Sequence, residues 1–72
     1  MYKEGFPKRL KAARIEAGYT QEQVAAKIGT KQTAISKYET GALEPNLETL
    51  AKLAQFYNVS INWLLSVTIE KD

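Results

Sequence analysis

The feature that most constrains the fold is a segment of eleven residues, Thr30 to Thr40, that ends at a glycine, Gly41. Its apolar residues lie close to the i, i+3 and i+4 spacing of one buried helical stripe: Ala34, Ile35 and Tyr38. We expect Thr30 to cap the start of this helix by accepting a backbone N–H, and Gly41 to end it in the left-handed conformation. The outward face then carries two cations, one amide and two hydroxyls: Lys31, Gln32, Thr33, Ser36 and Lys37.

A second short helix precedes this segment. Thr20 followed three residues later by Gln23 is a capping box, which starts a helix at Gln21. Gly29 is expected to end it after about two turns by adopting a positive φ, and Ala25 is small enough for the next helix to approach closely. The sequence from Gln21 to Thr40 therefore predicts two short helices joined by a tight turn.

The rest of the chain also has helical periodicity. A first helix is expected from Phe6 to Gly18, a fourth from Leu47 to Asn58 after an Asn46 cap, and a fifth from Ile61 to Leu65 after a Ser60 cap. The expected buried stripes are Phe6, Leu10, Ala13 and Ala17 in the first helix, and Leu47, Leu50, Leu53, Ala54 and Tyr57 in the fourth. This pattern predicts an all-α domain of five helices over residues 1–72, with a core at about 6–65, a flexible arm at 1–5 and a tail at 66–72 that is either frayed or packed on a second subunit.

Length and composition exclude several classes of protein. Seventy-two residues make one domain, which buries only about 60% of its unfolded surface. The absence of Cys and His leaves no disulfide and no ordinary zinc site, so no metal or cofactor is expected, and no small-molecule ligand is evident. No apolar run approaches the roughly 20 residues that cross a bilayer, and the first residues do not resemble a signal peptide, so we expect a cytoplasmic protein.

The charges are unevenly distributed. From Met1 to Lys37 there are eight cations and three anions, a net charge of +5, whereas from Tyr38 to Asp72 there are two cations and five anions, a net charge of −3. The polar face described above belongs to the basic half. Helical surfaces often carry lysines, so charge alone fits either an ordinary solvated surface or a nucleic-acid interface.

The segment from Gln21 to Thr40 resembles the helix-turn-helix of the phage-repressor and Cro family of DNA-binding domains, often called XRE-type. The resemblance runs from about Phe6 to Leu65 and includes Thr20-Gln21, Gly29-Thr30, Glu39-Thr40-Gly41, Pro45 and the closing residues from Asn58 to Leu65. It implies a compact, lambda-repressor-like five-helix fold whose third helix, about residues 31–39, reads bases in the DNA major groove.

The resemblance also implies roles for particular residues. The DNA base or groove contacts would be Lys31, Gln32, Thr33, Ser36 and Lys37, and the phosphate contacts would be Gln21, Thr30 and Thr40. Arg14 and Glu39 would form an internal structural ion pair. The chemistry agrees, because Gln32 can pair bidentately with adenine, a lysine can donate to guanine, and the Thr33 methyl can contact thymine.

We therefore expect a sequence-specific transcriptional regulator, more specifically a repressor, that binds a double-stranded DNA operator as a homodimer with its two reading helices about 34 Å apart. The expected dimer surface is Trp63, Leu65, Val67 and Ile69, although a tryptophan such as Trp63 is more often part of the core than of an interface. An enzyme is not expected, because no serine has a histidine to activate it. The alternative is a helical protein-interaction module, such as an antitoxin or anti-repressor.

Overall fold

The computed structural model describes residues 5–65, which form five helices. In chain order these are α1 (Phe6–Ala17), α2 (Gln21–Ile28), α3 (Gln32–Thr40), α4 (Leu47–Tyr57) and α5 (Ile61–Leu64). The prediction of an all-α fold with five helices is confirmed for this part of the chain. The expected arm up to residue 4 and the expected tail at 66–72 lie outside the described residues. No helix within 5–65 is long and apolar enough to span a membrane.

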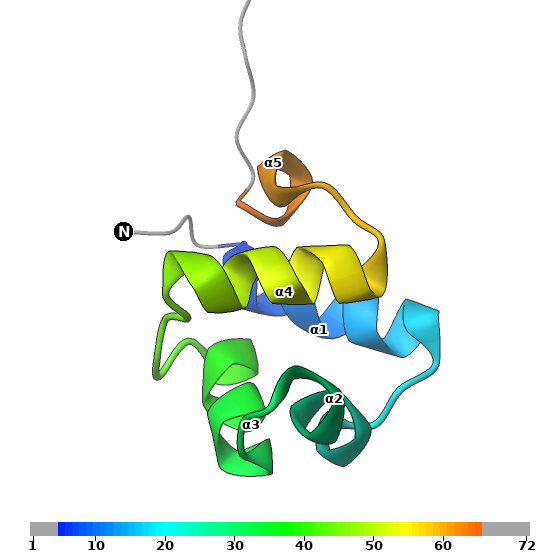
Figure 1. Cartoon of the computed structure of the whole chain (residues 1–72). Coiled ribbons are helices and arrows are strands. Elements are labelled where there is room, and N and C mark those ends of the chain that lie inside the picture. The colour runs from blue at the N-terminus through cyan, green and yellow to red at the C-terminus, as the bar shows by residue number, and fades with distance from the viewer. Residues whose placement is uncertain (1–4, 66–72) are drawn as a thin grey trace, which may run out of the picture.

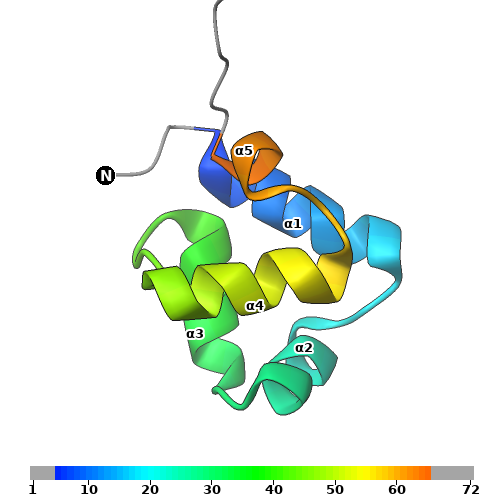
Figure 2. The ribbon, with the colours of Figure 1, turned by 45° about the horizontal axis from the view of Figure 1, so that its top comes forward.

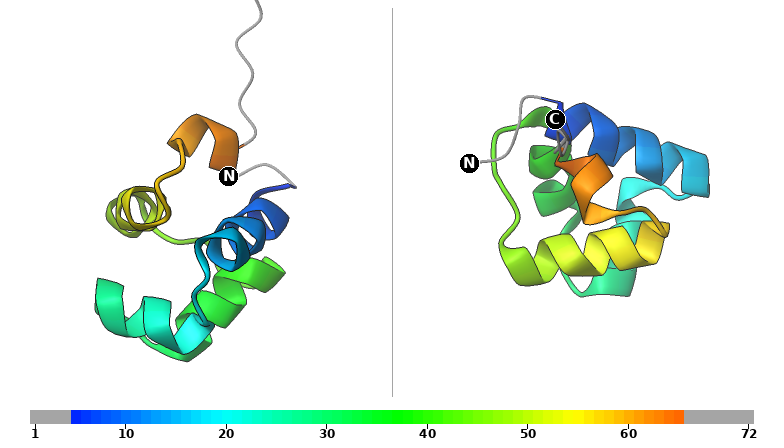
Figure 3. Two further views of the ribbon diagram at one scale, coloured as in Figure 1. Left: turned by 90° about the vertical axis from the view of Figure 1, so that its right-hand side faces the viewer. Right: turned by 90° about the horizontal axis from the view of Figure 1, so that it is seen from above.

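The five helices are arranged around α1. Figure 1 shows α4 running across α1, with α2 and α3 on one side of this pair and α5 on the other. The same separation is visible from the side in the left panel of Figure 3, where α5 and the α2–α3 pair lie at opposite ends of the molecule. In Figure 2, α5 lies next to the N-terminal half of α1. The fold therefore exposes α2 and α3 together on a surface remote from α5.

Local chemistry ends each helix near the predicted residue. Thr20 and Gln23 form the expected capping box, with hydrogen bonds of 3.1 and 2.9 Å in the two directions. The side chains of Asn46 and Ser60 accept from the backbone N–H groups of Thr49 and Trp63, at 2.8 and 2.9 Å. At the C-terminal ends, three glycines and Asn58 adopt left-handed conformations, including Gly29 at φ +80° between α2 and α3.

Three expectations about helix ends are wrong. Thr30 does not cap α3, because its N–H donates to the Ala25 carbonyl at 2.9 Å and it therefore belongs to the turn that closes α2. The N-cap is Lys31, which makes no side-chain cap, so α3 covers Gln32–Thr40 instead of beginning at residue 31. Gly5, expected in the flexible arm, is the N-cap of α1, and its carbonyl accepts from the Arg9 N–H at 3.0 Å.

The core consists of one cluster of side chains from all five helices: Phe6, Leu10, Ala13, Val24, Ala25, Ile35, Tyr38, Leu50, Leu53, Ala54, Tyr57 and Leu64. Two residues of the predicted stripes are not in it. Leu47 is 76% exposed and Ala17 is also exposed, because each occupies an end of its helix, beyond the region covered by neighbouring helices. Trp63 is half-exposed at 41% and so belongs only partly to the core.

Candidate nucleic-acid interface

The outward face of α3 carries the predicted polar residues. Lys31, Gln32, Thr33 and Lys37 are exposed, and Ser36 is half-buried. On the opposite face, Ile35 is buried against the core. The structure therefore places all five candidate DNA base or groove contacts on one short helix and its N-cap, while the apolar face of that helix fixes its orientation.

Beneath this face lies an ion pair between Arg14 of α1 and Glu39 of α3. The guanidinium donates from Nε to Glu39 Oε2 at 2.7 Å and from Nη2 to Oε1 at 3.1 Å. The Glu39 side chain is only 2% exposed, and the Arg14 side chain 12%. Hydrogen bonding to this carboxylate raises the pKa of Arg14 above its ordinary value. The internal pair that the resemblance implied is present.

A third donor of Arg14 reaches a different element. Its Nη1 donates to the backbone carbonyl of Tyr19 at 2.9 Å, in the connection between α1 and α2. One side chain therefore links α1, the start of the helix-turn-helix and the end of α3. A buried ion pair fixes the elements that it joins most strongly when it is bidentate and its donors all have partners.

Gln21 extends this network to the surface. Its Nε2 donates to Glu39 Oε1 at 3.0 Å, and its Oε1 accepts from Gln32 Nε2 at 2.6 Å. A continuous chain of side-chain hydrogen bonds thus runs from Arg14 through Glu39 and Gln21 to Gln32. The sequence identified all four residues, but it assigned Gln21 only to a phosphate and not to the positioning of Gln32.

The hydrogen bond that Gln32 donates to Gln21 leaves the rest of the Gln32 amide available. A primary amide has two N–H donors and one carbonyl acceptor, and Gln32 uses one donor on Gln21. One N–H and the Oε1 remain. These are the two groups that pair with N7 and N6 of adenine in the major groove.

The candidate phosphate contacts lie at the two ends of this surface. Thr30 is half-buried in the α2–α3 turn. The Thr40 hydroxyl donates to the Lys37 carbonyl at 3.2 Å and accepts from the Ala42 N–H at 3.4 Å, so it stabilises the C-terminal end of α3. The Leu43 N–H also donates to the Lys37 carbonyl, at 3.2 Å. Two backbone donors of the loop after α3 therefore already have partners within the protein.

The expected dimer surface is only partly described. Trp63 is half-exposed on α5 and Leu65 is partly buried against the core, whereas Val67 and Ile69 lie outside the described residues. Sequence reasoning missed the role of Arg9. Arg9 Nη1 donates to the Trp63 carbonyl at 2.9 Å, and the guanidinium lies 5.2 Å from the indole centroid. This contact depends on how α5 packs, and no pattern in the sequence indicates it.

Comparison with known proteins shows where this arrangement recurs. Residues 10–64 match a family model described as "Helix-turn-helix". The chain is 47% identical, over 81% of its length and 46% of the relative's, to the "HTH-type transcriptional regulator ImmR" of Bacillus subtilis (strain 168). It is 41% identical, over 85% of its length and 55% of the relative's, to the "Cryptic phage CTXphi transcriptional repressor RstR" of Vibrio cholerae. The chain thus spans about half the length of these curated relatives.

A solved structure has the same architecture. The crystal structure of the P22 c2 repressor protein in complex with a synthetic operator superposes with a TM-score of 0.81, at 28% sequence identity, over 88% of this chain and 96% of that one. The two chains therefore share the five-helix, lambda-repressor-like fold.

Proposed function

The chain belongs to the helix-turn-helix family, and from that premise we propose that it is a sequence-specific DNA-binding transcriptional regulator, specifically a repressor, acting on a double-stranded operator in the cytoplasm. Its α3 enters the major groove, and its partners are DNA and a second copy of the chain. The similarity to a repressor in complex with a synthetic operator supports this proposal, because the two chains share the same fold over 88% of this chain.

The observation that carries the proposal is the hydrogen-bonded state of Gln32. An exposed glutamine side chain ordinarily samples many rotamers, and fixing it on a base costs conformational entropy. Here the Gln21 amide, itself anchored on the buried Glu39 carboxylate, holds Gln32 before DNA arrives. The remaining donor and acceptor of Gln32 match one adenine edge, so the expected specificity at this position is for adenine.

The other residues of the α3 face complete the expected contacts. Thr33 would place its methyl against thymine, Lys37 would donate to guanine or to a phosphate, and Ser36 would add a weaker polar contact. Lys31, at the N-cap, is exposed beside Gln32 and suits a phosphate or the groove edge. Gln21, Thr30 and Thr40 are the proposed phosphate contacts. Gln21 would donate from the second N–H of its side-chain amide, the first being bonded to Glu39.

We also propose that the active form is a homodimer. A single module of this size buries only about 600–1,000 Å² on DNA, which is usually too little for tight specific binding. A second copy would place a second α3 about one helical turn, roughly 34 Å, along the duplex. The proposed surface is Trp63 and Leu65 with Val67 and Ile69, and α5 lies on the side of the molecule remote from α3 (Figure 1).

The direct test is selection of bound sequences from a random duplex pool at two salt concentrations. We expect a two-fold symmetric consensus with an adenine at a fixed position in each half-site. In matched binding assays, Gln32→Ala should weaken binding to the selected site by about 1–3 kcal/mol and leave random DNA unaffected, while the exposed Gln55→Ala control on α4 should change neither. A pool that yields no consensus would favour the protein-interaction module instead.

A further inference from the structure

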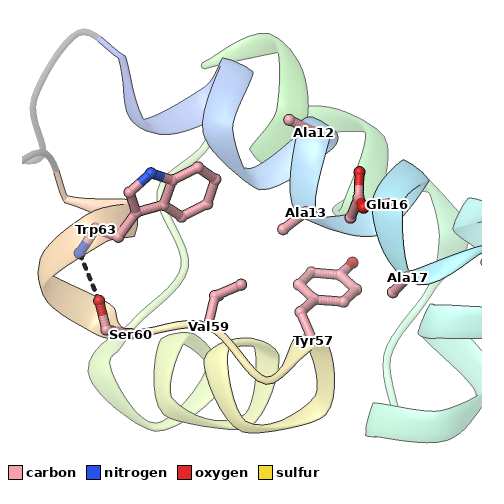
Figure 4. Close-up of a pocket in the computed structure, with 8 residues that line it drawn as sticks. All are labelled: Ala12, Ala13, Glu16, Ala17, Tyr57, Val59, Ser60 and Trp63. Atoms are coloured by element: carbon pink, nitrogen blue, oxygen red, sulfur yellow. Dashed lines mark hydrogen bonds between the residues drawn. The ribbon is translucent and has the colours of Figure 1, made fainter.

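A groove lies between α1 and α5, beside the connection from α4 to α5 (Figure 4). Its volume is about 610 Å³, which falls within the roughly 300–1,000 Å³ typical of small-molecule sites. Most of its lining residues are apolar: Ala12, Ala13, Ala17, Val59 and Trp63. Such sites are mostly apolar and contain a few polar groups that orient the ligand. The groove therefore has the size and the lining of a site for a small organic molecule.

The indole of Trp63 forms one end of the groove and is held in place by its neighbours. Ser60 Oγ accepts from the Trp63 N–H at 2.9 Å. Arg9, which does not line the groove, donates to the Trp63 carbonyl at 2.9 Å, and its guanidinium lies 5.2 Å from the indole centroid. These contacts fix the wall before a ligand binds, so binding loses little conformational entropy at this end.

Tyr57 brings a buried hydroxyl without a partner to the groove. Figure 4 shows its ring extending from the end of α4 toward α1, with the hydroxyl on the side of Glu16 and Ala17. Tyr57 is only 6% exposed, and its hydroxyl has no hydrogen-bond partner within residues 5–65. Leaving such a group unsatisfied costs about 1–3 kcal/mol. A ligand that donates to this oxygen would offset that cost.

Glu16 gives the groove a negative charge. It is the one formally charged residue among those that line the groove. Its neighbours three and four positions earlier on α1 are Ala13 and Ala12, which cannot pair with it, and Glu16 forms no ion pair within the described part of the chain. A carboxylate in this state attracts a cation and repels an anion. The charge therefore selects among ligands of similar shape.

We propose that this groove binds a small hydrophobic primary amine. Its ammonium group, which has three donors, bonds to the Glu16 carboxylate and the Tyr57 hydroxyl, while its hydrocarbon part lies against the alanines and Trp63. No motif in the sequence indicates this site, because its lining residues come from α1 and from residues 57–63. The inference does not rest on the proposed DNA-binding function, so either can fail without the other.

Titration of the full chain with 4-phenylbutylamine tests this proposal through the emission of Trp63, the only tryptophan. The matched probes are 4-phenylbutanol and 4-phenylbutyrate, which carry the same hydrocarbon with a neutral or an anionic end. We expect saturable binding of the amine with a dissociation constant in the millimolar range or below, weaker binding of the alcohol and the weakest binding of the acid. The rise in melting temperature with amine concentration provides a second measure.

Variants locate the amine in the groove. Glu16→Gln should weaken amine binding about two- to fivefold and leave the alcohol unaffected, whereas the exposed Glu22→Gln control on α2 should change neither. Tyr57→Phe should weaken amine binding about two- to tenfold. Ala12→Leu fills the alanine side of the groove and should weaken the amine and the alcohol alike, while Ala26→Leu, an exposed site on α2, should not.

Four results would overturn the proposal. Absence of saturable binding would show that the groove holds no such amine. Equal binding of the amine, the alcohol and the acid would show that Glu16 does not select the ligand. An equal effect of Glu16→Gln on the amine and the alcohol would show that the ammonium does not contact this carboxylate. An equal effect of Ala12→Leu and Ala26→Leu would place the amine outside the groove.

Discussion

Replacing Arg14 by alanine is expected to destabilise the domain by about 3–5 kcal/mol, because it leaves the Glu39 carboxylate buried without its counter-charge. The Glu39 side chain is only 2% exposed, so in the folded protein its charge is compensated by the guanidinium and not by solvent. The variant loses two hydrogen bonds to the carboxylate and one to the Tyr19 carbonyl, so that within residues 5–65 the Gln21 amide is the side-chain donor left on Glu39. A natural domain of 72 residues has a total stability of about 4–11 kcal/mol. The loss is therefore a large fraction of the whole.

Urea denaturation followed by circular dichroism at 222 nm measures this loss, with Lys11→Ala on the same helix as the control. Lys11 is exposed, so its replacement should change the free energy of unfolding by less than about 0.5 kcal/mol. A double variant separates charge from packing. Arg14→Met with Glu39→Leu removes both charges while retaining apolar volume, and should recover most of the lost stability.

The double variant also separates folding from recognition. With Glu39 replaced by Leu, the Gln21 Nε2 loses its acceptor, so Gln21 no longer has an anchor from which to hold Gln32. We expect a folded protein with weakened preference for its selected site. If Arg14→Ala lowers the free energy of unfolding by less than about 1 kcal/mol, the buried pair does not support the fold. If the double variant keeps its full preference for the selected site, the pair does not support the α3 face.

Three other variants test separate parts of the structure. Tyr57→Phe should stabilise the domain by about 1 kcal/mol at pH 7, because the Tyr57 hydroxyl is the buried side-chain polar atom without a partner among the described residues. Burial raises the pKa of Tyr57, so ionisation of this hydroxyl in the unfolded chain should lower the stability of the domain as the pH rises above about 10, and melting curves of the variant should lack this alkaline loss. Thr20→Ala should cost about 1 kcal/mol in the same denaturation assay, since it removes the α2 cap, and an unchanged midpoint would contradict the capping role. Lys31→Ala should reduce the slope of log K against log salt concentration by about 0.9 if Lys31 contacts a phosphate, and an unchanged slope would remove that assignment.

Much of the fold could be predicted because its helix ends depend on local chemistry. The Thr20–Gln23 capping box, the left-handed residue after α2 and the Asn46 cap each involve residues a few positions apart, so the sequence displays them directly. The errors have a different origin. Leu47 fits the periodicity of α4 but lies at its first turn, where no neighbouring helix covers it, and periodicity carries no information on where such cover ends.

The exposure of the α3 face could be predicted from the sequence, whereas the hydrogen bonds that connect its residues to the core could not. The outward face of α3 follows from helical spacing, and the ion pair followed from resemblance to a family. The bonds from Gln21 to Glu39 and to Gln32 join residues 18 and 11 positions apart. They depend on the crossing of α2 and α3, which a single sequence does not specify. The same applies to the contact of Arg9 with Trp63, which are 54 positions apart.

The most direct measurement replaces one acceptor on the DNA. In the site selected from the random pool, the adenine assigned to Gln32 is exchanged for 7-deazaadenine, which lacks the N7 acceptor but keeps the N6 donor and the base pair. The unmodified protein should lose about 0.5–1.5 kcal/mol of binding free energy, the value of one hydrogen bond, while Gln32→Ala should lose nothing further. If both proteins lose the same amount, or neither does, Gln32 does not read that adenine and the proposed role of the α3 face is wrong.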